Sequence, residues 1–101
     1  MNKKTYLDEK FWVEKQGNLS KIGLTKGALQ QFDHIDWIEL PKIGKILEKG
    51  STAVVVESSK AAIDIEAPLS GTVREVNTAL ESSPRLLEEA PEETWLYVVE
   101  E

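Results

Sequence analysis

The residue with the clearest potential for chemistry is Lys60, because it lies at the tip of a predicted β-hairpin. Residues 54–56 are three valines, and β-branched side chains favour a pleated strand. Ile63 and Ile65 alternate with acidic residues, which is the two-residue period of a half-buried strand. Such a hairpin would present one primary amine to a modifying enzyme. The residues beside that amine are small; they are Ser58, Ser59, Ala61 and Ala62.

A lysine on a turn is also typical of an ordinary solvated charge, and the spacing alone leaves both interpretations open. Lys60 is the only lysine after Lys49, although the chain contains ten. Gly50 and Gly71 bound the hairpin on its two sides. The tip has no Asn-Gly or Asp-Gly pair, so the sequence does not specify the turn type.

The remaining titratable residues predict no catalytic or metal centre. His34 is the only histidine, and a lone histidine forms neither a metal cluster nor an assignable catalytic triad. The acid pairs at residues 88–89 and 92–93 are typical of a solvated acidic run. The chain has no cysteine, so sulfur redox chemistry would have to come from an attached cofactor. We therefore expect a protein that is not an enzyme.

Size and charge narrow the possible partners. The 101 residues predict a single domain over residues 1–101, and 41% of them are hydrophobic. The net charge of −6 argues against nucleic-acid binding, which requires an excess of lysine and arginine. Residues 51–101 hold eleven acids against three basic residues, which indicates either docking to basic surfaces or a solvated surface. Neither a signal peptide nor a membrane-spanning run is visible, so we expect a cytoplasmic protein.

The elements that must position Lys60 are short strands. Residues 11–15 and 19–25 flank a Gly-Asn turn and predict an opening hairpin. Thr25 is placed to cap a short helix that runs through Phe32. Residues 34–40 alternate again, with Ile35 and Trp37 on one face, and the strand ends at Pro41.

The second half continues the strand pattern. Residues 42–50 predict a short strand between tight turns, and residues 72–77 and 95–99 predict two further strands. Residues 79–91 predict a helical turn or loop. The three tryptophans, at positions 12, 37 and 95, all fall in predicted strands and are expected in the core, with room for one edge of a ring to be exposed. Many short strands with one or two helical turns indicate an all-β sandwich or flattened barrel.

The segment around Lys60 resembles a known family motif. Residues 56–61, Val-Glu-Ser-Ser-Lys-Ala, resemble the lipoyl-lysine motif Glu-Ser-x-Lys-Ala of the glycine cleavage system H protein. The resemblance extends in order over roughly residues 6–99. The other matching segments are residues 22–25 (Ile-Gly-Leu-Thr), 37–41, 44–50, 68–73 and 76–77, with Pro84, Leu86, Leu87, Pro91 and Trp95 at the closing spacing.

The resemblance implies a mostly β, lipoyl-domain-like barrel-sandwich hybrid fold, with lipoic acid attached covalently to Lys60. It implies a lipoate ligase or lipoyltransferase as the enzyme that loads the lysine. In the family, the arm receives an aminomethyl group from glycine decarboxylase, passes it to aminomethyltransferase and is reoxidised by dihydrolipoyl dehydrogenase. The resemblance assigns cofactor presentation and partner recognition to residues around Lys60; these are Glu57, Ser58, Ser59, Ala61 and Asp64.

The sequence departs from the family pattern at positions that hold the loaded arm. Residues 10–13 are Lys-Phe-Trp-Val where the family has His-Glu-Trp-Val, so Phe11 replaces a carboxylate. Gln31 stands where a histidine is expected, whereas Asp64 is retained. The sequence ends at Glu101, where the family continues with a helix. This pattern resembles the short bacterial H-like proteins.

Three other functions remain alternatives. Some H-like carriers serve lipoate relay or redox-linked ADP-ribosylation, with a sirtuin-type ADP-ribosyltransferase and a macrodomain hydrolase as partners. A biotin carrier is a second alternative. The lysine of biotin domains resembles a Met-Lys-Met tip, whereas Lys60 lies in Glu-Ser-Ser-Lys-Ala, which argues against this alternative. A third is a plain β-sandwich interaction module in which Lys60 is an ordinary surface residue.

Overall fold

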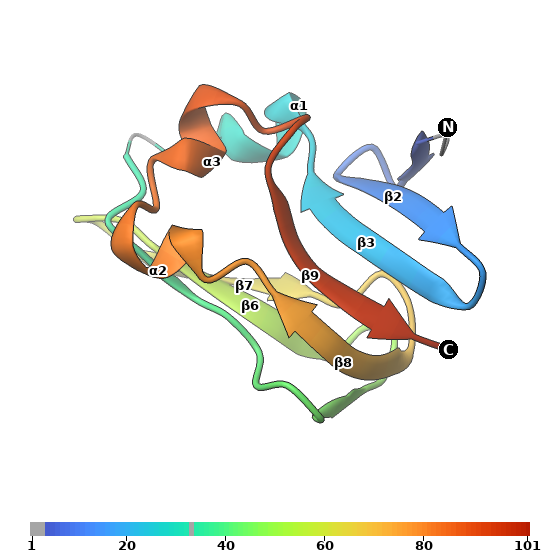
Figure 1. Ribbon diagram of the computed structural model, residues 1–101. Coiled ribbons are helices and arrows are strands. Elements are labelled where there is room, and N and C mark those ends of the chain that lie inside the picture. Colours follow the sequence, from blue (N-terminus) through green and yellow to red (C-terminus); the bar gives the residue numbers. More distant parts are fainter. Residues whose placement is uncertain (1–3, 33) are drawn as a thin grey trace.

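Two antiparallel sheets dominate the fold, which the computed structural model describes for residues 4–32 and 34–101 (Figure 1). The larger sheet has six strands in the order β1-β2-β3-β9-β8-β5. Its strands are β1 (Lys4–Leu7), β2 (Phe11–Gln16), β3 (Leu19–Leu24), β5 (Ile46–Leu47), β8 (Gly71–Val76) and β9 (Trp95–Glu100).

The smaller sheet contains the predicted hairpin. It consists of β4 (Trp37–Glu39), β6 (Thr52–Glu57) and β7 (Ala62–Glu66), with β6 in the centre. The register pairs Val56 with Ile63 and Val54 with Ile65, so their apolar side chains share the inward face. The predicted mostly-β sandwich class is confirmed.

The core forms where the inward faces of the two sheets meet. Val54 and Val56 of the hairpin are fully buried in the same cluster as Val73 and Leu96 of the larger sheet. Burial of one face and exposure of the other explains the alternation of β7, whereas β2 and β9 include runs of three and four buried residues. The sandwich therefore anchors the hairpin stem while its tip projects from one end (Figure 1).

The opening hairpin is confirmed, and a strand precedes it that the sequence did not predict. Strands β2 and β3 pair along their whole length, and Gly17 supplies the left-handed turn with φ +63°. Before them, Asp8 and Glu9 both adopt positive φ, and the Lys10 amide donates to the Leu7 carbonyl at 3.1 Å. This tight turn adds β1 to the edge of the larger sheet.

The predicted cap is confirmed, although its helix is shorter than expected. The Thr25 hydroxyl accepts a hydrogen bond from the Ala28 amide at 3.2 Å and donates to the Glu9 carbonyl at 2.9 Å. Helix α1 covers only Lys26–Leu29. Gly27 lowers helix propensity, and a single turn has few internal hydrogen bonds to sustain it.

The prediction that all three tryptophans lie in the core is wrong at Trp37, which is 51% exposed. Only residues 37–39 of the predicted strand 34–40 form β4, and Ile38 pairs with Val56 on the inward face. Trp37 therefore lies on the outer face. Ile35 is buried, but it belongs to the loop before β4, so the alternation of the strand does not determine its position. Trp12 is buried and Trp95 is half-buried.

The predicted helical segment near the end contains two single turns. Helix α2 spans Ala79–Ser82 and helix α3 spans Leu86–Glu89. Each turn places one fully buried leucine into the core, Leu80 and Leu87. These turns close the sandwich on the side that also holds α1 (Figure 1). None of the helices in the described part of the chain is long and apolar enough to cross a membrane.

Candidate functional site

The candidate site is the tip that joins β6 to β7. Ser59, Lys60 and Ala61 are exposed, and the tip begins one residue after the strand ends at Glu57. The stem below it is fixed by the antiparallel ladder and by the buried valines on its inner face. A rigid stem with a small, exposed tip positions the Lys60 backbone while leaving its side chain accessible to a large partner.

Ser58 shapes this tip through its backbone and its hydroxyl. Its amide donates to the Ala61 carbonyl at 2.9 Å, which closes the turn. Its hydroxyl oxygen accepts from the amides of Lys60 and Ala61, each at 3.3 Å, and donates to the Ala61 carbonyl. Serine side chains commonly replace a backbone partner in this way in turns. The four residues are thereby held together by a hydroxyl that the sequence places two residues before the lysine.

The turn differs from the usual two-residue hairpin loop. Types I′ and II′ require a positive φ at the first central residue. Among the described non-glycine residues only Asp8 and Glu9 have positive φ, so Ser59 and Lys60 do not form a primed turn. The Ser58 hydroxyl compensates, because it accepts hydrogen bonds from the amides of Lys60 and Ala61 within this loop.

The carboxylates next to the tip lie on the outer face of the hairpin. Glu57 pairs with Ala62 and Asp64 pairs with Val55, which places these side chains on the face opposite the core. Glu57 is half-buried and Asp64 is exposed. The hairpin therefore presents negative charge on its outer face, close to Lys60.

A cavity of about 290 Å³ opens beside β7. It brings together Phe11, Gln31 and Asp64, which are the three positions that the family resemblance links to the loaded arm. Phe11 is only 2% exposed, so the wall at this position is apolar. The Gln31 amide donates to the Ala28 carbonyl at 3.1 Å, which turns this side chain toward α1. The remaining lining residues are Lys10, Leu24, Ala28, Ile63, Ile65 and Glu66.

Lys10 and Glu66 were missed as candidates by the sequence reasoning. They add one positive and one further negative group to the cavity. Glu66 continues the alternation of Asp64 along β7, and this period was a usable signal. Lys10 precedes β2 in a turn, and its position follows from the register of the first hairpin, which the sequence does not specify.

The other titratable candidates occupy structural positions. His34 is exposed, with its Nδ1 4.0 Å from the Glu88 carboxylate. Glu88 accepts a hydrogen bond from the Ile35 amide at 2.6 Å, and Glu92 accepts one from the Tyr6 hydroxyl at 2.8 Å. That bond, followed by burial, raises the pKa of Tyr6. The acidic run is therefore not merely solvated, since two of its members tie loops to the sandwich.

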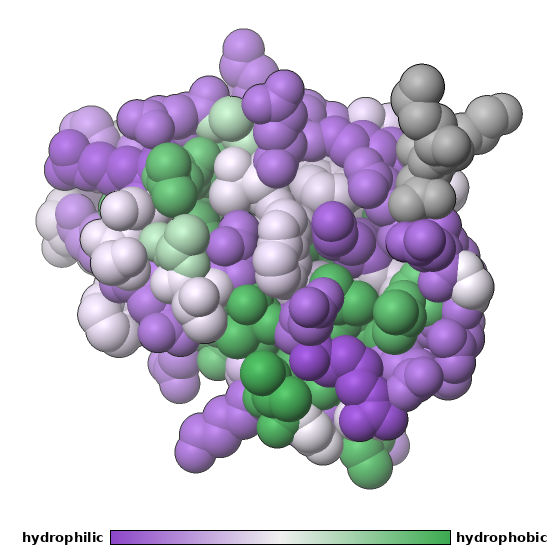
Figure 2. Space-filling view, viewed as in Figure 1, coloured by the Kyte–Doolittle hydropathy of each residue, from purple (hydrophilic) through white to green (hydrophobic). Residues whose placement is uncertain are grey.

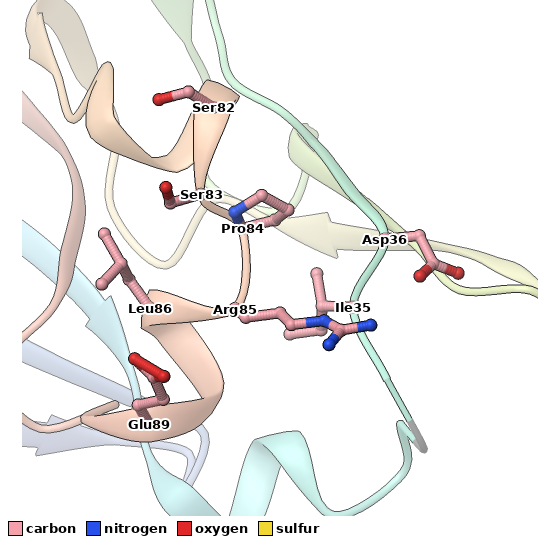
Figure 3. A pocket seen from close by; sticks show the side chains of 8 residues that line it. All are labelled: Ile35, Asp36, Ser82, Ser83, Pro84, Arg85, Leu86 and Glu89. Carbon is pink, nitrogen blue, oxygen red and sulfur yellow. The ribbon is translucent and has the colours of Figure 1, made fainter.

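A second cavity, of about 500 Å³, lies between α2, α3 and the loop before β4 (Figure 3). Figure 3 shows the Arg85 side chain extending across it toward Ile35, while the Asp36 carboxylate points away. The hydroxyls of Ser82 and Ser83 lie on the far side of Pro84 from this guanidinium. These polar groups do not converge on one point, so we assign no chemistry to this cavity.

Comparison with known proteins gives one consistent result. The family model for the glycine cleavage H-protein matches residues 4–101. A glycine cleavage system H protein from Xanthobacter autotrophicus is 46% identical over 87 residues, which cover 86% of this chain and 70% of that protein. The one from Thermotoga maritima is 37% identical over 101 residues, with 99% and 82% covered.

A solved structure agrees with the sequence matches. The crystal structure of a glycine cleavage system H protein from Mycobacterium marinum superposes with a TM-score of 0.86 at 29% identity. The match covers 96% of this chain and 82% of that one. The fold around the hairpin and the family match over nearly the whole chain lead to the same conclusion: the chain belongs to the glycine cleavage H-protein family, whose members are lipoyl carriers.

Proposed function

We propose that residues 1–101 form a single lipoyl-carrier domain that carries lipoic acid in amide linkage on Lys60. The observation that supports this most directly is the serine-closed tip, which exposes Lys60 within the run from Glu57 to Ala61. Small neighbours leave room for a loading enzyme to reach Nζ. The proposed loading enzyme is a lipoate ligase or lipoyltransferase.

In this proposal the chain holds the Lys60 amine where the loading enzyme can reach it and provides the surface by which partner enzymes recognise it. Acylation of Nζ converts an ammonium into a neutral amide, so the net charge falls by one from −6. The bound group supplies a reducible dithiolane on a long flexible arm, and the chain supplies position and recognition. In this proposal Glu57 and Asp64 face the partner, and Ser58, Ser59 and Ala61 keep the tip open.

Intact-mass measurement after incubation with lipoate, ATP and a lipoate ligase tests the loading step. We expect one lipoyl addition to the native chain and none to Lys60→Arg. Lys49→Arg is the matched control, because it replaces another exposed lysine and retains the charge. Full loading of Lys60→Arg would refute the assignment.

We also propose that the loaded chain serves glycine decarboxylase, aminomethyltransferase and dihydrolipoyl dehydrogenase. The cavity beside β7 would receive the arm, with Asp64 as a polar contact and Phe11 as an apolar wall. Because this wall lacks a carboxylate, we expect a weaker hold on the loaded arm. Reconstituted glycine decarboxylation should fall in Asp64→Asn and rise in Gln31→His, which returns the expected histidine at an exposed position. An unchanged rate in both variants would exclude the cavity from the cycle.

The alternative of lipoate relay or redox-linked ADP-ribosylation gains no support from the family model or from the relatives described above. It stays a sequence-based prediction, as does a cytoplasmic location. Reconstitution with the glycine cleavage enzymes separates the two roles, since only a shuttle would support turnover.

A further inference from the structure

We propose that the segment around β5 is a docking surface for an enzyme that processes the arm, distinct from the tip that carries Lys60. The partner surface we infer is an apolar hollow rimmed by carboxylates. This inference rests on the proposed carrier function. We call the surface the lysine–isoleucine patch and define it by Lys42, Ile43, Lys45, Ile46 and Lys49.

The patch exposes the two most accessible large aliphatic side chains among the described residues. Ile43 is 65% exposed and Ile46 is 75% exposed. Figure 2 shows hydrophobic side chains along the lower edge of the molecule, beside hydrophilic ones, where Figure 1 places this segment. Apolar side chains that protrude together from a charged surface are typical of a protein-binding site.

The charge of the patch is opposite to that of the molecule. Lys42, Lys45 and Lys49 are all exposed, and none forms an ion pair with a described residue. The whole chain carries −6, so this positive cluster lies in a negative field. The three lysines outnumber the acids near them, which are Glu48 in the same segment and Glu39 in a cavity with Lys42 and Lys45. A partner surface with an apolar centre and a carboxylate rim complements this excess of positive charge, and such complementarity speeds encounter and suppresses wrong partners.

The backbone holds the patch in one shape. The Gly44 amide donates to the Val73 carbonyl at 2.7 Å, and the Val73 amide donates to the Lys45 carbonyl at 2.8 Å. Leu47 is 1% exposed and anchors the strand from its inner face. The isoleucines are therefore presented by a rigid strand edge, which lowers the entropic cost of binding.

The patch lies at the end of the hairpin away from the tip. Strand β5 pairs with Gly71 and Thr72, and the Gly50 amide donates to the Ala67 carbonyl just beyond β7. The six residues of β6 then separate this end from the tip by roughly 20 Å, at about 3.3 Å per residue. A partner bound at the patch would leave Lys60 accessible, as a carrier with a mobile arm requires.

Steady-state kinetics of the lipoylated chain test the proposal with purified glycine decarboxylase, aminomethyltransferase and dihydrolipoyl dehydrogenase. The variants are Ile43→Asp with Ile46→Asp, and Lys42→Glu with Lys45→Glu. The matched controls are Leu19→Asp, at another exposed aliphatic residue, and Lys15→Glu with Lys26→Glu. Intact mass first establishes that every protein is lipoylated, so a failure of the carrier proposal is seen separately. Thermal unfolding establishes that the variants are folded.

We expect both patch variants to raise KM for the lipoylated chain with one of the three enzymes by roughly five- to tenfold, because interface anchors and rim charges act on association. The kcat should stay unchanged, and added salt should raise KM of the native chain more than that of the lysine variant. Unchanged KM values with all three enzymes would overturn the proposal. An equal rise in the control variants would also overturn it, since a general charge effect would then explain the result.

Discussion

The hairpin tip and the contact between Trp12 and Gly23 are opposite in physical character, although Lys60 and Gly23 both fall in segments that resemble family motifs. The tip is exposed, and local hydrogen bonds of Ser58 hold it. The Trp12 side chain is 2% exposed and donates from Nε1 to the Pro91 carbonyl at 2.9 Å. A Cβ at Gly23 would lie 2.1 Å from its ring.

The two regions have different roles: the tip exposes Lys60, and the Trp12–Gly23 contact stabilises the fold. Replacing a tip residue removes few core contacts, because Ser59, Lys60 and Ala61 are exposed and the tip lies outside the buried cluster. Replacing a residue at the Trp12–Gly23 contact disturbs the pairing of β2 with β3 and the loop that ends at Pro91. Substitutions at the two regions should therefore affect loading and folding independently.

The largest expected effect on stability is at Gly23. Gly23→Ala places a methyl group inside the Trp12 ring, so we expect a loss of about 3 kcal/mol in the free energy of unfolding. Gly17→Ala is the control, since that residue has φ +63° but an added methyl group there would meet no atom within 4 Å. We expect about 1 kcal/mol there, from backbone strain alone. Equal losses in urea denaturation would show that the ring contact contributes nothing.

The second effect concerns a buried hydroxyl in the core. Tyr97 is 1% exposed, and its hydroxyl has no hydrogen-bond partner in the described part of the protein. Burial accordingly raises the pKa of Tyr97. Tyr97→Phe removes the unsatisfied group and should stabilise the fold by about 1 kcal/mol. A destabilisation of similar size in the same denaturation assay would mean that the hydroxyl is satisfied.

At the tip, the expected change is larger in loading than in folding. Ser58→Ala removes the hydroxyl that orders Lys60 and Ala61, and we expect a stability loss of about 0.5 kcal/mol. The rate at which a lipoate ligase loads the lysine should fall several-fold. Ser59→Ala is the control, because Ser59 is exposed and equally small. Equal loading rates for the two variants would contradict a role for the Ser58 hydroxyl.

The smallest effect is a pH dependence at the end of β9. Hydrogen bonding and charge attraction from Arg74, whose Nε lies 2.6 Å from Glu100, lower the pKa of that carboxyl from 4.5. Because the pKa is lower in the folded state, this carboxylate stabilises the fold at pH values above its ordinary pKa. The contribution is lost as the pH falls through the pKa of the folded state. Arg74→Met should therefore lower Tm slightly at pH 7 and not at pH 2. A Tm difference that persists at pH 2 would assign the effect to packing.

The sequence was sufficient where a local pattern determines the structure. The β-branched run at residues 54–56 and the alternation over residues 63–66 predicted the hairpin, and Thr25 predicted the helix start. Strand propensity, strand period and capping all depend on near neighbours. The fold class and family followed from the ordered motifs. The assignment of Lys60 as the attachment site depends on the resemblance and stays a proposal.

The failures arose where distant segments determine the structure. The outer position of Trp37 depends on which face of β4 meets Val56, and this register is set by the central hairpin. Strand β1 is joined to β2 by a turn at Asp8 and Glu9, residues without a glycine signal. The composition of the cavity beside β7 depends on β2, α1 and β7 meeting, which no local pattern specifies.

The most direct test of the account moves the lysine by one position without changing composition. The double variant Ser59→Lys with Lys60→Ser keeps the hairpin, the charge and the exposure of the amine. Its loading by a lipoate ligase is measured by intact mass, with fragmentation to locate the modified residue. If the Ser58-closed tip positions one particular amine, we expect complete loading of the native chain and almost none of the variant. Loading at position 59 at the native rate would contradict the account, because any exposed lysine near the tip would then serve.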